Sequence, residues 1–194
     1  LRSFDFHDIE RLQTAGDWDG LTQMMIDAAR GLEAGGAGCL LICSNTMHKM
    51  APEVQAAVDI PLLHIGDAIA AAVHDSGAIR PLLLATRFAM EQDFYLGYLR
   101  ERHGIDAVVP KERDRMEVHR VIYEELCQGK VLDSSTRAYM QIIDRACSDA
   151  DAPADSVIFG CTEIGLLITP DDFSFPAFDT TVLHAEAALT FAGY

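Results

Sequence analysis

The chain has 194 residues, of which 49% are hydrophobic, and a formal net charge of -15 at pH 7. This length and composition suit one globular domain or two small lobes with a sizeable core. The acidic charge argues against a nucleic-acid partner, because affinity for phosphate backbones comes largely from Lys and Arg. No run approaches the length of a membrane span, and the first residues lack a signal-peptide pattern. We therefore expect a cytoplasmic protein without membrane contact.

Strand-like and helical patterns alternate through the first part of the chain. In chain order, we expect a strand at residues 1–6, a helix at 17–33, a buried strand at 40–43, a short helix at 52–58, a second strand at 60–65 and an alanine-rich helix at 67–74. Asp17 is a predicted N-cap, and Gly35 with Gly36 closes the first helix.

The alternation continues to the end of the chain. The expected elements are a strand at residues 81–87, a helix at 90–103, a short strand at 106–110, helices near 113–127 and 134–148, strands at 156–160 and 175–180, and a closing helix from 181. Alternating strands and helices are typical of an α/β fold in which helices cover both faces of a parallel sheet.

Five cysteines occur without a CxxC pair or another metal-ligand spacing. In a chain without an export signal, this pattern predicts free thiols rather than disulfides or metal ligands. The sequence also lacks the glycine-rich patterns GxGxxG and GxxxxGK[ST]. It therefore offers no nucleotide-binding loop.

Two polar clusters follow predicted strands. The stretch "LLICSNTMH" places Ser44, Asn45 and Thr46 after one strand, and "SVIFGCTE" places Cys161, Thr162 and Glu163 after another. Ligands of open α/β sheets bind beyond the carboxyl ends of strands. The repetition indicates a duplicated, two-lobed protein in which the two clusters face each other.

Each candidate residue also has a structural interpretation. Cys161 is either a thiol activated by the positive end of a helix or a small buried side chain. Of Cys43 and Ser44, only one is expected to face the cleft, because successive strand side chains point to opposite faces. Asn45 and Thr46 suit a carboxylate ligand or a helix cap.

Other polar residues near strand ends are weaker candidates. Arg87 suits an anion or a surface ion pair. The remaining candidates are more typical of packing or capping; they are His48, His64 and His184.

With both motifs in view, the chain resembles the aspartate/glutamate racemase family, and most closely its broad-specificity bacterial branch. The likeness also covers "DFHDIE", "IPLLHI", "TRFAMEQDFY", "VIYEELCQGK" and "FPAFDTTVLHAEAA". It implies a cofactor-independent amino-acid racemase that needs neither pyridoxal phosphate nor metal, works on a small amino-acid substrate and forms a homodimer.

The resemblance also implies two similar α/β lobes, each a parallel sheet flanked by helices, with the active site in the cleft between them. We expect residues 1–70 plus 178–194 in the first lobe and 71–177 in the second. Relative to the family, an opening strand, loop and helix that form one wall of the site are expected to be absent from the chain as given.

Family chemistry uses two thiols on opposite sides of the substrate, and one of them matches Cys161. The other position, immediately before the Asn-Thr pair, is Ser44, so the resemblance implies that Ser44 faces the substrate while Cys43 points into packing. A hydroxyl is a far weaker base than a thiolate. The resemblance with this departure predicts a slow or direction-biased racemase.

The family also implies contacts to the substrate. The substrate's carboxylate and ammonium would be held by Asn45, Thr46, Thr162 and Glu163. Gln13 falls where relatives place a side chain toward that of the substrate, and a neutral amide there would accept more than dicarboxylates. Thr86 is a further candidate contact.

Two other functions remain open from the sequence. Related decarboxylases of substituted malonates keep a single thiol in the second half, which the asymmetric Ser44 and Cys161 pair resembles. An amino-acid-binding protein that has lost catalysis is the other alternative.

Overall fold

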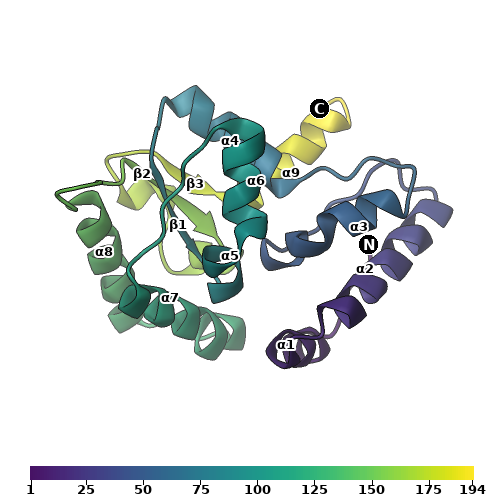
Figure 1. Ribbon diagram of the computed structural model, residues 1–194, viewed down its shortest axis with the longest axis horizontal. Coiled ribbons are helices and arrows are strands. Elements are labelled where there is room, and N and C mark those ends of the chain that lie inside the picture. Colours follow the sequence, from purple (N-terminus) through teal and green to yellow (C-terminus); the bar gives the residue numbers. More distant parts are fainter.

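The computed structural model describes residues 1–194 as a mixed α/β fold around a parallel three-stranded sheet of order β1-β2-β3 (Figure 1). The strands are β1 (Pro81–Ala85), β2 (Ser156–Gly160) and β3 (Ala177–Asp179). Every residue of β1 and β2 is buried, which is why their sequences are continuous apolar runs rather than alternating patterns. The predicted α/β fold class is confirmed.

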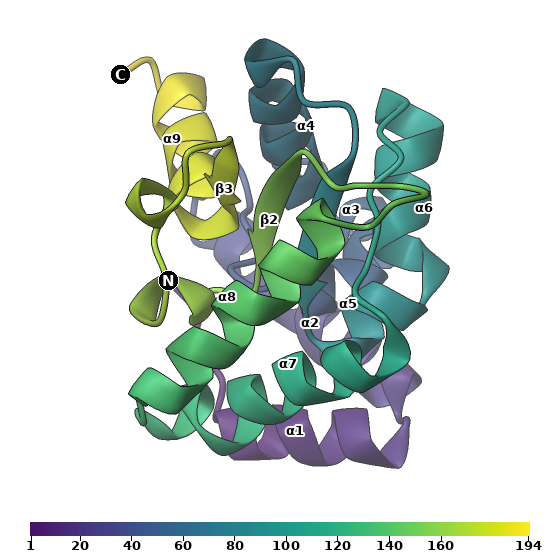
Figure 2. The same cartoon turned by 90° about the vertical axis from the view of Figure 1, so that its left-hand side faces the viewer.

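Helices cover both faces of this sheet. Figure 2 shows α7 and α8 in front of β2, with α4 and α6 behind it. The helices are α1 (Phe6–Ala15), α2 (Trp18–Ala34), α3 (Ala51–Ala56), α4 (Ile65–Ser76), α5 (Arg87–Glu91), α6 (Asp93–His103), α7 (Glu112–Glu124), α8 (Asp133–Cys147) and α9 (Thr180–Phe191). The short 3-10 helices are η1 (Thr46–Met50), η2 (Leu126–Gln128), η3 (Ile164–Leu166) and η4 (Pro170–Asp172).

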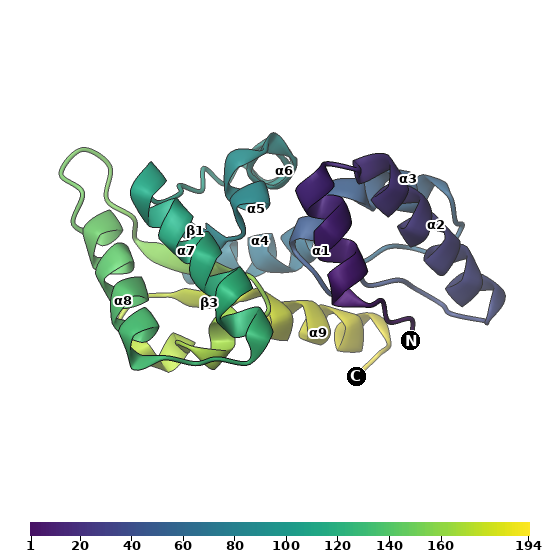
Figure 3. The same ribbon diagram turned by 90° about the horizontal axis from the view of Figure 1, so that it is seen from below.

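The buried apolar side chains form two separate clusters. One, with 10 buried residues, runs from Ile9 to Val58, and the other, with 28, runs from Ile65 to Phe178. Helix α9 extends from the sheet toward the half of the molecule that holds α1 and α2 (Figure 3). The boundaries of the two predicted lobes remain a prediction.

The predicted strands of the first half form little sheet. Residues 1–5 form neither strand nor helix, so the strand predicted at 1–6 is wrong; Asp5 instead caps α1 by accepting from the His7 N–H. Leu40 and Leu62 meet in a single parallel bridge, with Leu40 N–H donating to the Pro61 carbonyl at 2.9 Å. The strands predicted at 40–43 and 60–65 are therefore not formed as strands, because Leu40 and Leu62 are the only residues of the two segments that pair as in a sheet.

Two predictions in the second half need smaller corrections. The strand predicted at 106–110 is an isolated bridge between Val108 and Leu82. The helix predicted at 90–103 is two helices, since Gln92 has extended backbone angles and separates α5 from α6.

Candidate active site

A cavity of about 700 Å³ is lined by all eight residues that the sequence singles out. Four lie at residues 13–46 and four at residues 86–163. They are Gln13, Ser44, Asn45, Thr46, Thr86, Cys161, Thr162 and Glu163. The structure therefore brings the two polar clusters together at one site, as the sequence predicted.

Cys161 is placed by the close packing of the strand that precedes it. Strand β2 pairs Gly160 with Ala85 of β1. A Cβ atom on Gly160 would lie 2.6 Å from Leu83 Cδ1 and 3.0 Å from Ala85 Cβ. Only glycine lets the two strands approach this closely, and the chain then leaves the sheet with Cys161 at the cavity.

The Cys161 thiol donates to the Glu163 carboxylate, with 2.8 Å between Sγ and Oε2. Burial raises the pKa of Cys161 well above its ordinary 9.0, and the Glu163 carboxylate raises it further. The helix-end activation considered from the sequence is absent, because the helix after Cys161 is the three-residue η3. The Cys161 thiol is therefore protonated at neutral pH.

Ser44 lies between the end of the extended segment and η1. Its hydroxyl accepts from the Met47 N–H at 3.5 Å. Cys43 and Ser44 both line the cavity, and Cys43 is exposed. The expectation that Cys43 points into packing is wrong, because the extended segment makes its only bridge at Leu40 and nothing covers Cys43.

Asn45 is buried to 3% exposure, and protein groups occupy both ends of its amide. Tyr95 Oη donates to Asn45 Oδ1 at 2.7 Å, and Asn45 Nδ2 donates to Thr180 Oγ1 at 3.0 Å. Thr180 Oγ1 in turn donates to the Phe159 carbonyl at 2.8 Å. Through these hydrogen bonds the Asn45 side chain connects the start of η1 to α6 and α9, and through Thr180 to β2.

Two of the three predicted threonine contacts, Thr46 and Thr86, form a hydrogen bond with each other. Thr46 Oγ1 lies 2.8 Å from Thr86 Oγ1, and both side chains are buried. By contrast, the backbone N–H groups of Asn45 and Thr162 donate no hydrogen bond within the protein. These two N–H groups, one from each strand end, remain free for an anionic ligand.

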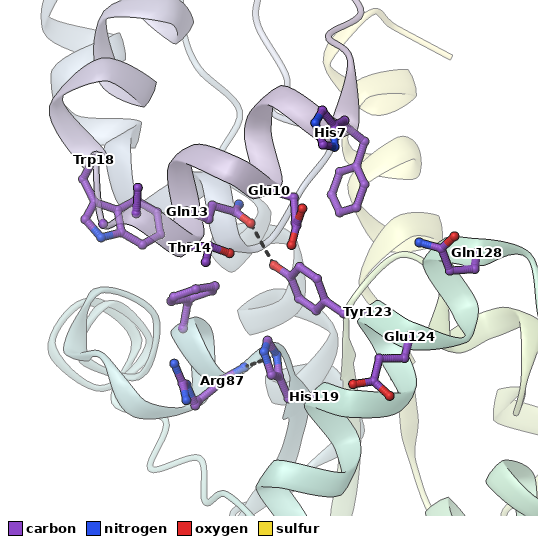
Figure 4. Close-up of a pocket in the computed structure, with 14 residues that line it drawn as sticks. His7, Glu10, Gln13, Thr14, Trp18, Arg87, His119, Tyr123, Glu124 and Gln128 are labelled. Carbon is purple, nitrogen blue, oxygen red and sulfur yellow. Dashed lines mark hydrogen bonds between the residues drawn. The ribbon is translucent and has the colours of Figure 1, made fainter.

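Gln13 is buried to 5% exposure and is also held from the other half of the molecule. Tyr123 Oη donates to Gln13 Oε1 at 2.8 Å, and Gln13 Nε2 lies 3.6 Å from Met47 Sδ. Gln13 and Tyr123 line a second cavity as well, of about 630 Å³, which Figure 4 shows between α1 and α7.

Three histidines pack behind Ser44. The Ile65 N–H donates to His48 Nε2 at 3.1 Å, so His48 Nδ1 carries the hydrogen and donates to the Ser44 carbonyl at 2.8 Å. The His48 ring contacts His64 and His184, with ring centroids 4.5 and 5.8 Å apart. Burial lowers the pKa of His48 to about 3 and that of His64 to about 4. The cluster is structural and uncharged at neutral pH.

The sequence did not single out Tyr123 or Cys127, although both line the main cavity. A signal for Tyr123 was its spacing from His119, since residues four apart share one face of a helix. No comparable signal marked Cys127. No group of three or more His, Cys, Asp or Glu side chains is arranged to hold a metal ion, and none of the helices has the length and apolar character to cross a membrane.

The chain thus combines a parallel α/β fold with one cavity that is lined by the Cys161 thiol and the Ser44 hydroxyl, from segments distant in sequence. The sequence profile of the Asp/Glu/Hydantoin racemase family matches residues 1–188. The chain belongs to this family, and the resemblance drawn from its motifs is confirmed.

Solved structures agree with this assignment. A proposed Asp/Glu racemase from Yersinia pestis is 45% identical over 100% of this chain and 83% of that chain, with a TM-score of 0.89. An aspartate racemase homologue from Pyrococcus horikoshii is 33% identical over 100% of this chain and 82% of that chain, with a TM-score of 0.82. Arylmalonate decarboxylase shares the fold at 15% identity over 91% of this chain and 76% of its own, with a TM-score of 0.57.

Proposed function

We propose that this protein is a broad-specificity amino-acid racemase that inverts the α-carbon by moving protons between Cys161, Ser44 and the substrate. The observation that carries the proposal is the single cavity lined by Ser44 from one half of the chain and Cys161 from the other. A two-sided site is what inversion requires, because a proton must leave one face of the α-carbon and return to the opposite face.

In one direction, the Cys161 thiolate takes the α-proton and Ser44 gives its hydroxyl proton to the opposite face of the carbanion. The Cys161 proton first leaves to solvent through Glu163, with which the thiol is already hydrogen bonded, so that Glu163 is again a carboxylate. After inversion, Cys161 carries the substrate's proton and Ser44 is an alkoxide. Exchange with solvent restores both groups before the next turnover.

The backbone at the two strand ends supplies groups for the substrate's carboxylate. We assign the carboxylate to the free N–H groups of Asn45 and Thr162, while the Asn45, Thr46 and Thr86 side chains position the strand ends that carry them. The substrate ammonium pairs with Glu163. Gln13 presents a neutral amide instead of a charge, which is consistent with substrates beyond dicarboxylates.

The unequal pair makes the two faces of the substrate behave differently. Ser44 is a poor base and Cys161 a better one. An enantiomer whose α-hydrogen faces Cys161 therefore exchanges that hydrogen with solvent faster than it inverts, because return of the proton to the same face avoids Ser44. The opposite enantiomer exchanges only as fast as Ser44 removes its proton.

Proton NMR in deuterated water tests the proposal. Loss of the α-proton signal is followed for separate L- and D-amino acids, without added cofactor, while inversion is followed by chiral chromatography. Cys161→Ala is expected to lower exchange about 100-fold or more, the contribution typical of a general base. Cys147→Ala, which removes a thiol outside the cavity, is the matched control. Full exchange in Cys161→Ala would exclude the mechanism.

The same assay tests the cofactor and the Ser44 role. Exchange is expected to survive a metal chelator and removal of carbonyl cofactors by dialysis against hydroxylamine. Ser44→Cys is expected to raise exchange of the enantiomer that faces Ser44, because a thiol is the stronger base. No gain in that variant would argue against a catalytic Ser44.

A malonate-type decarboxylase is the second candidate, favoured by the protonated state of the Cys161 thiol. A neutral thiol is suited to protonating the enediolate that loss of carbon dioxide leaves. Carbon dioxide release from an arylmalonate, without amino-acid exchange, would support it. Amino-acid binding with neither reaction would indicate a binding protein.

We further propose a homodimer, a cytoplasmic location and the two lobes 1–70 plus 178–194 and 71–177.

A further inference from the structure

The second cavity adjoins the first through a shared wall. Phe6, Gln13 and Tyr123 line both cavities, and the Tyr123–Gln13 hydrogen bond of 2.8 Å crosses the boundary between them. The Tyr123 ring also packs against Phe6 and His119, at centroid distances of 6.1 and 4.6 Å. Phe6, Gln13 and Tyr123 therefore form a wall shared by the two cavities, with one neutral hydrogen bond across it.

Glu10 is a charge in the second cavity without a partner. It is half-buried on α1, and its carboxylate makes neither a hydrogen bond nor an ion pair. Figure 4 shows it pointing toward Tyr123, beside Gln13. The other charges in this cavity are engaged: Arg87 pairs with Glu91 at 3.8 Å, and Glu124 with Arg120 at 3.7 Å.

None of the other lining side chains, exposed His7 included, forms a hydrogen bond or ion pair with Glu10. His119 Nδ1 accepts from the Arg87 N–H at 3.3 Å, and burial lowers the pKa of His119, so its ring is neutral. Thr14 and Gln128 contribute uncharged polar groups. A partly desolvated carboxylate at the edge of a cavity gains most from a cationic ligand.

We propose that the second cavity is a side-chain subsite for long cationic amino acids of the lysine and ornithine class. With the α-carbon between Ser44 and Cys161, the methylene chain passes the Gln13–Tyr123 hydrogen bond and the terminal ammonium pairs with Glu10. Short amino acids leave that hydrogen bond closed. This subsite rests on the racemase function proposed above for its catalytic consequence, but its binding step does not require turnover.

The test compares L-lysine with L-2-aminoheptanoate, which has a side chain of similar length without the charge. Both α-proton exchange and calorimetric binding are measured for the wild type, Glu10→Gln and the matched control Glu53→Gln on α3. Glu10→Gln is expected to lower the ratio of kcat/KM for lysine over aminoheptanoate about tenfold or more, the size of one hydrogen bond to a charged group. Glu53→Gln is expected to leave the ratio unchanged.

Tyr123→Phe tests the partition separately, since it keeps the ring and removes the hydroxyl. It is expected to raise kcat/KM severalfold for both long substrates relative to alanine. An unchanged lysine preference in Glu10→Gln, in exchange and in binding, would overturn the subsite. If the wild type exchanges no amino acid but still binds lysine in a Glu10-dependent way, the racemase proposal fails and the subsite stands.

Discussion

The Cys161 thiol and the Glu163 carboxylate determine the protonation state of the site. A carboxylate 2.8 Å from sulfur opposes the thiolate, and burial opposes it further. A substrate ammonium near Glu163 would offset this repulsion. In the proposed mechanism, proton abstraction by Cys161 is therefore coupled to substrate binding.

This arrangement predicts an alkaline pH dependence. Because the pKa of Cys161 is raised, kcat/KM for exchange is expected to keep rising with pH above neutral without a plateau near the ordinary thiol pKa. In Glu163→Gln, loss of the neighbouring charge is expected to move Cys161 titration to lower pH. Thiolate absorbance, taken as a difference from Cys161→Ala, measures it directly. An unchanged titration in Glu163→Gln would contradict the assigned cause.

The Tyr95 hydroxyl is expected to matter for stability rather than chemistry. It is buried to 2% exposure and donates to Asn45 at 2.7 Å. Tyr95→Phe leaves a buried amide oxygen without its donor, so the free energy of unfolding should fall by about 1–3 kcal/mol. Urea denaturation measures the change. Tyr194→Phe, at 92% exposure, is the control and should have no effect.

At the scale of elements, the junction of β1 and β2 is the least tolerant part of the fold. Gly160→Ala would place a Cβ 2.6 Å from Leu83 Cδ1. We expect a loss of about 1–3 kcal/mol in the free energy of unfolding, as for other overpacked cores, together with reduced activity as Cys161 shifts. In Gly31→Ala, at an exposed position of α2 with nothing within 4 Å of the new Cβ, the change should be neutral or stabilising. Equal effects of both variants would refute the packing argument.

The elements with strong local signals could be predicted from the sequence. The continuous apolar runs of β1 and β2 and the Asp17 cap of α2 gave those elements close to their observed bounds. For residues 1–6 the sequence could not distinguish a strand from the approach to a helix, because alternating apolar residues in so short a segment fit both. Residues 40–43 have the composition of a strand. Whether they form one depends on pairing with Leu62, which is distant in sequence, and only Leu40 makes that pairing.

In the site, too, contacts between residues distant in sequence could not be predicted from local patterns. The sequence indicated that the polar clusters at residues 44–46 and 161–163 line one cavity, because strand ends of parallel sheets collect ligands. Gln13 and Thr86 were predicted only through the family resemblance. It could not indicate that the Asn45 amide is already occupied by Tyr95 and Thr180, which lie 50 and 135 residues away in the chain. Nor could it reveal the contact of Gln13 with Tyr123, 110 residues apart.

At the scale of the whole molecule, the histidine cluster links the two halves and makes the fold sensitive to acid. His48 bonds to Ser44 and Ile65, and His184 Nε2 donates to the Leu63 carbonyl at 2.7 Å. These contacts join η1, α4 and α9. They require neutral rings, because His48 Nε2 and the His64 Nδ1 that caps α4 act as acceptors.

Acid is therefore expected to destabilise the protein through these rings. Their pKa is near 6.5 in the unfolded chain but about 3 for His48 and about 4 for His64 when folded. Between these values the unfolded state binds more protons. Stability is thus complete above pH 6.5 and falls as pH drops toward 4 and then 3, by about 1.4 kcal/mol per pH unit for each ring.

Urea denaturation at a series of pH values tests this expectation against variants. His64→Asn keeps a side chain able to cap α4 and removes one titrating ring, so its stability should depend less steeply on pH than that of the wild type. His7→Asn, at an exposed position, should retain the wild-type slope. Identical slopes in all three proteins would assign the acid sensitivity to carboxylates instead.

The equilibrium between the two enantiomers limits how the unequal Ser44 and Cys161 pair can affect the kinetics of inversion. Mirror-image amino acids have the same free energy in water, so the equilibrium constant of racemisation is unity. By the Haldane relation, kcat/KM for inversion must then be equal for both enantiomers, however unequal the acid and the base. In inversion, unlike in α-proton exchange, the asymmetry of the site can appear only as a matched difference in kcat and KM, with the slowly inverted enantiomer bound more tightly. The proposed racemase, with its unequal Ser44 and Cys161 pair, therefore binds one enantiomer of its substrate more tightly than the other but produces neither in excess.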